Sequence, residues 1–128
     1  MEKIKFIKLH ESENNTVVIL AAKNIISASR NDRETTIGYI DGEDMSSELV
    51  VNETPEKIST LVDFKMIKLH NYDDNTVIML NINYIKYIRR DEGSDGTTVE
   101  IFDNEFTVNE TPEKIFNILQ KEEQNKLQ

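Results

Sequence analysis

The octapeptide V-N-E-T-P-E-K-I occurs twice in this chain, at residues 51–58 and again at residues 108–115. In both places Thr is followed by Pro and then Glu, an order typical of a helix start: an N-cap hydroxyl, a first-turn Pro and an acidic side chain near the positive end of the helix dipole. We interpret the octapeptide as a strand-to-helix corner, with a ligand site at its Asn-Glu pair as the alternative. The predicted N-cap residues and first-turn prolines are Thr54, Pro55, Thr111 and Pro112.

The repetition extends outward from the octapeptide over nearly the whole chain. Residues 6–10 read F-I-K-L-H, and residues 66–70 read M-I-K-L-H. The spacing between equivalent residues changes along the chain only in segments rich in Gly, Asp and Ser, where turns tolerate insertions. The sequence therefore predicts a duplication, with a first repeat at residues 1–64 and a second at residues 65–128, packed together as one globular unit.

Each copy reads as about five antiparallel strands followed by one C-terminal helix. Ile7 and Leu9 alternate with polar residues, as on a strand with one buried face. Residues 16–21 are β-branched and apolar, which predicts a second strand that is mostly buried. Ile58 and Leu61 begin an apolar stripe at helical spacing. The predicted fold class is α+β, built from two tandem pseudo-symmetric repeats.

One copy of about sixty residues buries too little apolar surface to be comfortably stable alone. Residues 62–65, V-D-F-K, offer no Gly, Pro or Ser linker between the copies. We therefore expect the copies to pack against each other about an approximate two-fold axis, the geometry of a fused homodimer. The pattern leaves open whether they share one sheet or form two small barrels.

The charge of the chain limits its partners. Fifteen Lys and Arg stand against 24 Asp and Glu, which gives a net charge of −9. Nucleic acids and anionic membranes are bound largely through basic residues, so this balance argues against both. There is no Cys, which excludes disulfides and thiolate chemistry. We find no signal-peptide pattern and no apolar run of membrane-spanning length, and expect a cytoplasmic location without membrane insertion.

Residues able to carry chemistry are few. The two His of the sequence, His10 and His70, occupy equivalent positions and are weak ligand candidates. A symmetry axis could bring them together around a metal, but outward-facing residues at strand ends are the favoured interpretation, because metal-ligating His normally has further ligands at short spacing. No Ser lies in a nucleophile elbow, and the four Gly are too scattered for a phosphate-binding loop. We expect no enzymatic activity, no catalytic or metal-binding residue and no cofactor.

Two other groups of residues have a functional and a structural interpretation. Residues 84–90 combine Tyr with Lys and Arg, a mixture that could stack a nucleic-acid base. A strand with apolar residues inward and basic residues outward is the favoured alternative. The acidic pairs at residues 73–74 and 91–92 lack the ligand spacing of a calcium loop and are interpreted as solvated turns.

The order of these motifs resembles a known family. An Ile-Lys-Leu strand, Asn-x-x-x-Ile at residues 81–85, a Thr-rich strand and the octapeptide follow one another as in the short FlbD-type proteins, which are encoded beside bacterial flagellar and swarming-motility genes. Each copy here would correspond to one such protein, although Ala21 stands where the second copy has Asn81. The resemblance implies a bacterial source and transfers no catalytic residue. A looser similarity connects the chain to the LytTR-type DNA-binding domain.

The function predicted from the sequence is that of a non-catalytic bacterial protein, a protein-interaction or adaptor module of the cytoplasm built by internal duplication. Its expected partner is an unknown protein, and self-association into a homo-oligomer through sheet edges or the two helices is a further option. A nucleic-acid-binding or regulatory module similar to LytTR-type domains is one alternative. A small-ligand-binding protein is the other.

Overall fold

The computed structural model describes residues 3–126, with side chains described through residue 121, and this part of the chain contains ten β-strands and two α-helices. The strands are β1 (Phe6–His10), β2 (Val17–Ala21), β3 (Ile25–Asn31), β4 (Glu34–Ile40), β5 (Ser46–Val51), β6 (Met66–His70), β7 (Val77–Asn81), β8 (Ile85–Arg90), β9 (Thr97–Ile101) and β10 (Asn104–Val108). The helices are α1 (Pro55–Leu61) and α2 (Pro112–Lys126), with short 3₁₀ turns η1 (Ala22–Asn24) and η2 (Ile82–Tyr84). Within the described residues, no helix combines the length and apolar character that a membrane span requires.

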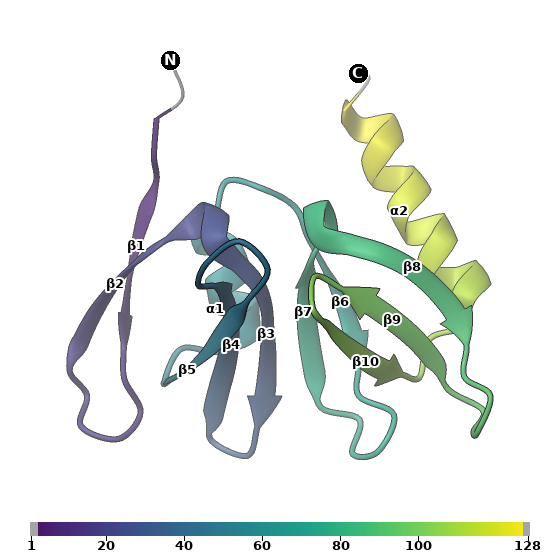
Figure 1. Cartoon of the computed structure of the whole chain (residues 1–128), viewed down its shortest axis with the longest axis horizontal. Coiled ribbons are helices and arrows are strands. Elements are labelled where there is room, and N and C mark those ends of the chain that lie inside the picture. Colours follow the sequence, from purple (N-terminus) through teal and green to yellow (C-terminus); the bar gives the residue numbers. More distant parts are fainter. Residues whose placement is uncertain (1–2, 127–128) are drawn as a thin grey trace.

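The strands form three antiparallel sheets (Figure 1). β1 pairs with β2 as a hairpin, and β8, β9 and β10 form a three-stranded sheet. The largest sheet has five strands in the order β5-β4-β3-β7-β6 and crosses the boundary between the copies. At the crossing, β3 of the first copy pairs with β7 of the second, with Ala28 opposite Met79 and Ser27 opposite Leu80. We call this contact the internal junction.

The predicted α+β fold of two tandem repeats, each of about five antiparallel strands followed by its own helix, is wrong. The fold is mostly β, and the five strands of one copy do not form a self-contained unit with their helix, because the largest sheet combines strands of both copies. The physical reason is the edge of β3. An unpaired strand edge leaves backbone N–H and C=O groups without partners, and β3 satisfies them with β7 of the other copy.

The expected two-fold arrangement of the copies is also wrong. A two-fold axis makes every contact twice, so pairing of β3 with β7 would require their counterparts, β8 and β2, to pair as well. The structure pairs β3 with β7 but places β8 beside β9 and β2 beside β1. The contact between the copies is therefore head-to-tail, with different surfaces on its two sides.

Two isolated bridges connect the three sheets into one strip of strands. Glu11 bridges to Val51 and so links the end of β1 to β5, while Asn71 bridges to Val108 and links β6 to β10. The strands then follow the continuous order β2-β1-β5-β4-β3-β7-β6-β10-β9-β8. β2 and β8 are the terminal strands of the strip, and in Figure 1 the β1–β2 hairpin lies at the left end and β8 with α2 at the right end.

Each copy has an apolar core that the other copy completes. The first core is built from strands of the first copy and Ile58 of α1, and it includes Met66 and Met79 of the second copy. The second core is built from strands of the second copy and Ile115 of α2, and it includes Ile26 of the first copy. The copies thus exclude water from each other's interior across the internal junction.

The predicted burial of the second strand is wrong for residues 16–21, whereas the equivalent strand of the second copy is buried. In β7, Ile78, Met79 and Leu80 are buried. In β2, Val17 and Ile19 are 47% and 61% exposed. The two strands have similar sequences, so the difference comes from their neighbours. β7 pairs on both sides, with β3 and β6, whereas within residues 3–126 β2 pairs with β1 alone.

The octapeptide forms the corner between the last strand and the helix of each copy. The Thr54 hydroxyl accepts a hydrogen bond from the backbone N–H of Lys57 at 3.1 Å, and Pro55 begins α1. In the second copy the Thr111 hydroxyl accepts from the backbone N–H of Lys114, also at 3.1 Å. Each bond satisfies one of the backbone N–H groups that the first helical turn leaves free.

Replacing Thr54 by Ala is expected to lower the free energy of unfolding by about 1 kcal/mol, because one N–H in the first turn of α1 loses its acceptor. Urea denaturation of the full chain measures the change. Thr54→Ser is the control, since it keeps the hydroxyl and should restore most of the loss. Equal losses for Ala and Ser would contradict a capping role.

Candidate functional site

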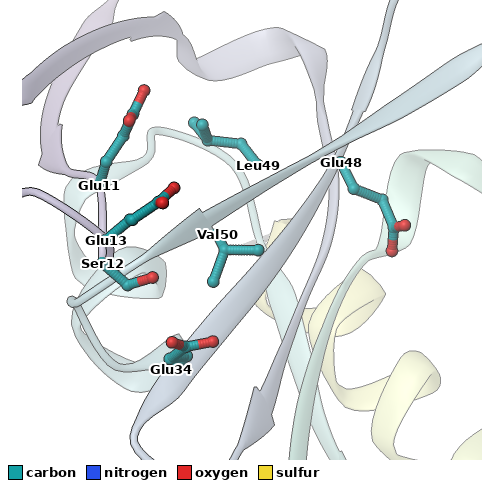
Figure 2. A pocket seen from close by; sticks show the side chains of 7 residues that line it. All are labelled: Glu11, Ser12, Glu13, Glu34, Glu48, Leu49 and Val50. Atoms are coloured by element: carbon teal, nitrogen blue, oxygen red, sulfur yellow. The ribbon is translucent and has the colours of Figure 1, made fainter.

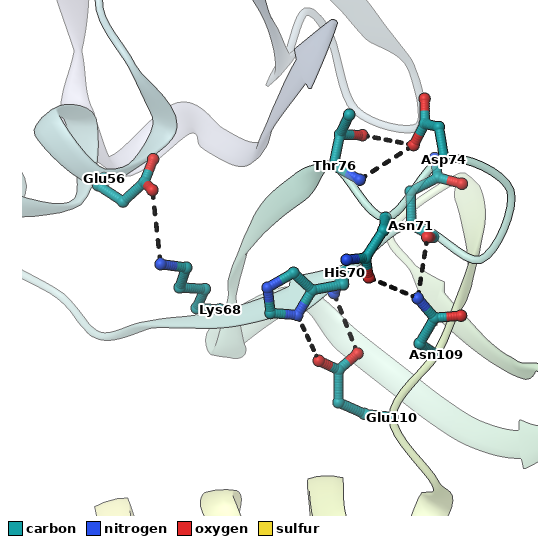
Figure 3. Close-up of polar contacts among 9 residues, drawn as sticks. Glu56, Lys68, His70, Asn71, Asp74, Thr76, Asn109 and Glu110 are labelled. Carbon is teal, nitrogen blue, oxygen red and sulfur yellow. Dashed lines mark hydrogen bonds and ion pairs between the residues drawn. The ribbon is translucent and has the colours of Figure 1, made fainter.

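A His-Glu pair anchors the octapeptide to the first strand in each copy. The backbone N–H of His10 donates to Oε1 of Glu53 at 3.0 Å, and the ring Nδ1 of His10 lies 2.7 Å from Oε2. His70 and Glu110 repeat this arrangement with the same distances (Figure 3). One carboxylate thus holds both the backbone and the ring of its His, and connects the end of β1 or β6 to the start of a helix.

The Asn of each octapeptide fastens a turn of the same copy. Asn109 donates through Nδ2 to the carbonyl of Asn71 at 3.3 Å (Figure 3). The same Nδ2 donates to Oδ1 of Asn75 at 2.8 Å. Asn52 makes the equivalent bond to Oδ1 of Asn15 at 3.0 Å. Asn15 and Asn75 have φ of 59° and 60°, a left-handed conformation that Asn tolerates better than most residues. The Asn-Glu pair of the octapeptide is occupied by contacts within the fold.

The His-Glu pairs are suited to fastening the corner rather than to binding a metal. His10 and His70 lie in separate copies, each with a Glu of its own copy on Nδ1. Within the residues that the structure describes, no three His, Asp or Glu side chains gather to hold a metal ion. The ligand interpretation of His10 and His70 has no support from their surroundings.

Acidification is expected to weaken the Glu53 corner. Burial acts to raise the pKa of the Glu53 carboxyl, but the hydrogen bonds from the ring and backbone of His10 outweigh it, and the pKa lies below its ordinary value of 4.5. A depressed pKa means that the unfolded chain binds the proton more tightly, so the stabilisation is present above the unfolded pKa and is lost as pH falls through the folded one.

The measurement is the free energy of unfolding from about pH 5 to about pH 3. Wild type should lose stability more steeply than Glu53→Gln, which has no carboxylate to protonate there. Glu113→Gln, an exposed change on α2, is the control and should keep the wild-type slope. Parallel curves for wild type and Glu53→Gln would show that Glu53 does not contribute.

In each acidic pair interpreted as a solvated turn, an Asp carboxylate accepts hydrogen bonds from residues nearby in the sequence. Oδ1 of Asp74 accepts from the backbone N–H and the hydroxyl of Thr76, which lowers the pKa of Asp74 (Figure 3). The hydroxyl of Ser94 donates to Asp91 at 2.7 Å and, with Thr98, lowers the pKa of that carboxyl. Both carboxylates satisfy groups of their own turns.

An acidic groove lies beside β5 in the first copy (Figure 2). It has a volume of about 470 Å³. Its lining residues are Glu11, Ser12, Glu13, Glu34, Glu48, Leu49 and Val50. Four carboxylates give it a negative potential, but no further feature of the groove indicates a particular ligand.

The basic-aromatic cluster predicted at residues 84–90 divides between η2 and the edge strand β8. The Tyr84 hydroxyl donates to the carbonyl of Lys23 at 3.1 Å, and its ring packs edge-on against Phe102 with centroids 5.9 Å apart. Tyr84 is therefore engaged in the contact between the copies. Tyr87 is 44% exposed on β8, where Lys86, Arg89 and Arg90 are also exposed.

The exposed apolar surface of the β1–β2 hairpin is the feature that sequence reasoning missed. Ile4, Phe6, Val17 and Ile19 are 58%, 59%, 47% and 61% exposed. Phe6 pairs with Ala21, Lys8 with Ile19 and His10 with Val17, so Phe6, Val17 and Ile19 share the face opposite the buried Ile7 and Leu9. We call this surface, defined by Phe6, Val17 and Ile19, the outer hairpin face. Its apolar residues are typical of a buried strand. It is exposed because, in the part of the chain that the structure describes, β2 has no second neighbouring strand to cover it.

No family model matches the sequence, no curated protein matches it, and no solved structure matches the fold. The resemblance to FlbD-type proteins stays a prediction from short motifs. The outer hairpin face with the open edge of β2 is the candidate site that the geometry of the chain itself indicates.

Proposed function

We propose that the chain is a non-catalytic protein-interaction module that binds an extended strand of a protein along the open edge of β2. The outer hairpin face supplies the apolar contact area. The cytoplasmic, bacterial setting of this module is carried over from the sequence.

The main support for the proposal is the difference in exposure between equivalent residues of the two copies. Met66 and Met79 of the second copy are 5% exposed, while their counterparts Phe6 and Ile19 in the first copy are exposed on the outer hairpin face. The same surface is thus covered where a neighbouring copy is available and open where none is. Clustered exposed apolar side chains mark interaction sites.

The edge of β2 supports binding by strand addition. Its sequence, V-V-I-L-A at Val17–Ala21, contains neither a charged residue nor Pro. Such residues normally protect exposed edges from pairing with another chain. An open strand without them can hydrogen-bond an added strand along its backbone, while alternate side chains fit the outer hairpin face.

Peptide display against the dilute, immobilised full chain tests the proposal. We expect enrichment of peptides with alternating apolar residues, and amide NMR shifts on binding that are concentrated in β2. Ile19→Lys, which puts a charge in the outer hairpin face, should abolish the enrichment, and Tyr87→Lys on the distant β8 should not. Equal enrichment on wild type and Ile19→Lys would refute a binding site at this edge.

A further inference from the structure

We infer that the strand that pairs with β2 is β8 of a second copy of this chain, so that molecules join head to tail. The inference rests on the proposed function, because it names the occupant of the same edge. It goes beyond that function by specifying the partner, the register and the form of the assembly.

The duplication supplies the first argument. The internal junction joins β3 of the first copy to β7 of the second. A head-to-tail contact uses one side from each copy, so the other two sides remain unused: β8, the counterpart of β3, and β2, the counterpart of β7. These are the two strands that terminate the strip. One molecule therefore ends in the two halves of a contact that its own fold already makes.

The internal junction also fixes the register. Ser27, Ala28 and Ser29 of β3 stand opposite Leu80, Met79 and Ile78 of β7. The counterparts of these residues give Tyr87, Ile88 and Arg89 of one molecule opposite Leu20, Ile19 and Val18 of the next. The added strand would be antiparallel, and β8 of the three-stranded sheet would gain the same kind of neighbour that β3 has in the largest sheet.

The apolar faces match in the same arrangement. α1 packs against both β3 and β7, and Leu61 and Val62 lie against the core that includes Met79. α2 packs against β8, and its Phe116 is 57% exposed. Docking of a second hairpin would place Phe6 and Ile19 of the outer hairpin face over α2 and Ile88, as Met66 and Met79 lie over the first core.

The charges near the ends of the contact are complementary. β8 carries Lys86, Arg89 and Arg90. In the inferred register the Arg residues lie at the end of the neighbour's β2 from which the β1–β2 loop leaves, and that loop carries Glu11 and Glu13. The attraction is local, because the whole chain has a net charge of −9. Added salt should therefore favour assembly by screening the overall repulsion, although it also weakens the local pairs.

Two substitutions make the contact between molecules weaker than the internal junction. Lys86 replaces the buried Ile26, and Ala21 replaces Asn81, whose side chain donates to the carbonyl of Ile25 at 2.8 Å across the internal junction. The intermolecular contact lacks that apolar side chain and that hydrogen bond. We expect reversible, concentration-dependent assembly. Repetition of a head-to-tail contact gives a closed ring if the rotation closes and a filament if it does not.

Engineered disulfides test the pairing directly, because the chain contains no Cys. Ile19→Cys and Ile88→Cys are prepared as separate full-length proteins, one with a short affinity tag. Facing residues of an antiparallel pair have Cα atoms about 4.5–5.5 Å apart, within the range that a disulfide spans. Mild oxidation should cross-link the mixture and leave each variant alone without cross-links. The positive control is the double variant Ala28→Cys, Met79→Cys, which should close a bond within one chain in the same register.

The outcomes separate the inference from its rivals. Cross-links in Ile19→Cys alone would indicate a symmetric β2–β2 contact and overturn the inference, as would their absence from the mixture while the control closes. Ala21→Asn restores the missing amide and should tighten assembly roughly two- to tenfold in sedimentation. No change in the sedimentation of wild type with concentration would also overturn it. If self-association fails but peptides are still selected on β2, the proposed function stands without the further inference. If peptide selection fails as well, both proposals are refuted.

Discussion

Met79→Ala is expected to lower the free energy of unfolding by about 2–5 kcal/mol, the range for truncating a large buried apolar side chain. Met79 belongs to β7 of the second copy but is buried in the core of the first. Truncation removes apolar contacts and leaves a cavity at the internal junction. Because single domains are stable by only about 5–15 kcal/mol, a loss of this size threatens the fold of the whole chain.

The duplication provides a matched control. Ile19→Ala changes the counterpart of Met79 on β2, where the side chain is exposed to water in the single molecule. The expected change there is below about 1 kcal/mol. Both variants are measured by urea denaturation at high dilution, which keeps self-association out of the comparison. Similar losses in the free energy of unfolding for Met79→Ala and Ile19→Ala would contradict the conclusion that only Met79 is buried by the other copy.

Asn81→Leu is expected to cost roughly 1–3 kcal/mol, the penalty for leaving buried polar groups without partners. Asn81 is 1% exposed. Its Nδ2 donates to the carbonyl of Ile25 at 2.8 Å, and its Oδ1 accepts from the backbone N–H of Asn83 at 3.0 Å. Leu has a similar branched shape but neither polar group, so the carbonyl of Ile25 and the N–H of Asn83 lose these bonds together.

Ala21→Leu is the control for this change, since Ala21 holds the equivalent position in the first copy and makes no side-chain hydrogen bond across a junction. Its effect is expected to stay within about 1 kcal/mol. Thermal unfolding at low protein concentration gives both values. A neutral result for Asn81→Leu would mean that the amide does not contribute to the internal junction.

The sequence predicts those features of the fold that depend on residues close together along the chain. The alternation around Ile7 and Leu9 predicts the buried face of β1, and both side chains are buried. The order Thr-Pro-Glu is a local rule, and the Thr54 hydroxyl accepts from the first turn of α1. Such features depend on neighbours within a few residues, which is why one copy of the sequence suffices to predict them.

The arrangement of the copies could not be predicted in the same way, because strand pairing depends on which edges remain free in the folded chain. One indication was present in the composition of two equivalent strands. β3 reads I-I-S-A-S-R-N, with small neutral residues at its centre, while β8 reads I-K-Y-I-R-R. Charged side chains are typical of an edge strand and small neutral ones suit a central strand. That difference distinguishes the two positions in the strip.

The candidate site was missed for a related reason. The outer hairpin face and its covered counterpart are both apolar, so the residue types of Ile19 and Met79 do not show which of them is buried. Burial of one and exposure of the other follow from the neighbour that each strand finds. Likewise the pairing of His10 with Glu53 joins residues 43 positions apart, and no local rule connects them.

The internal junction is head-to-tail, and we infer that its two halves recur, open, at β2 and β8. Residue-resolved amide hydrogen exchange of the full chain at several protein concentrations is the decisive test. We expect the amides at the β3–β7 pairing to be protected at every concentration, and protection in β2 and β8 to rise together as concentration increases. Protection in β2 and β8 that is independent of concentration, or that rises in only one of them, would contradict this inference.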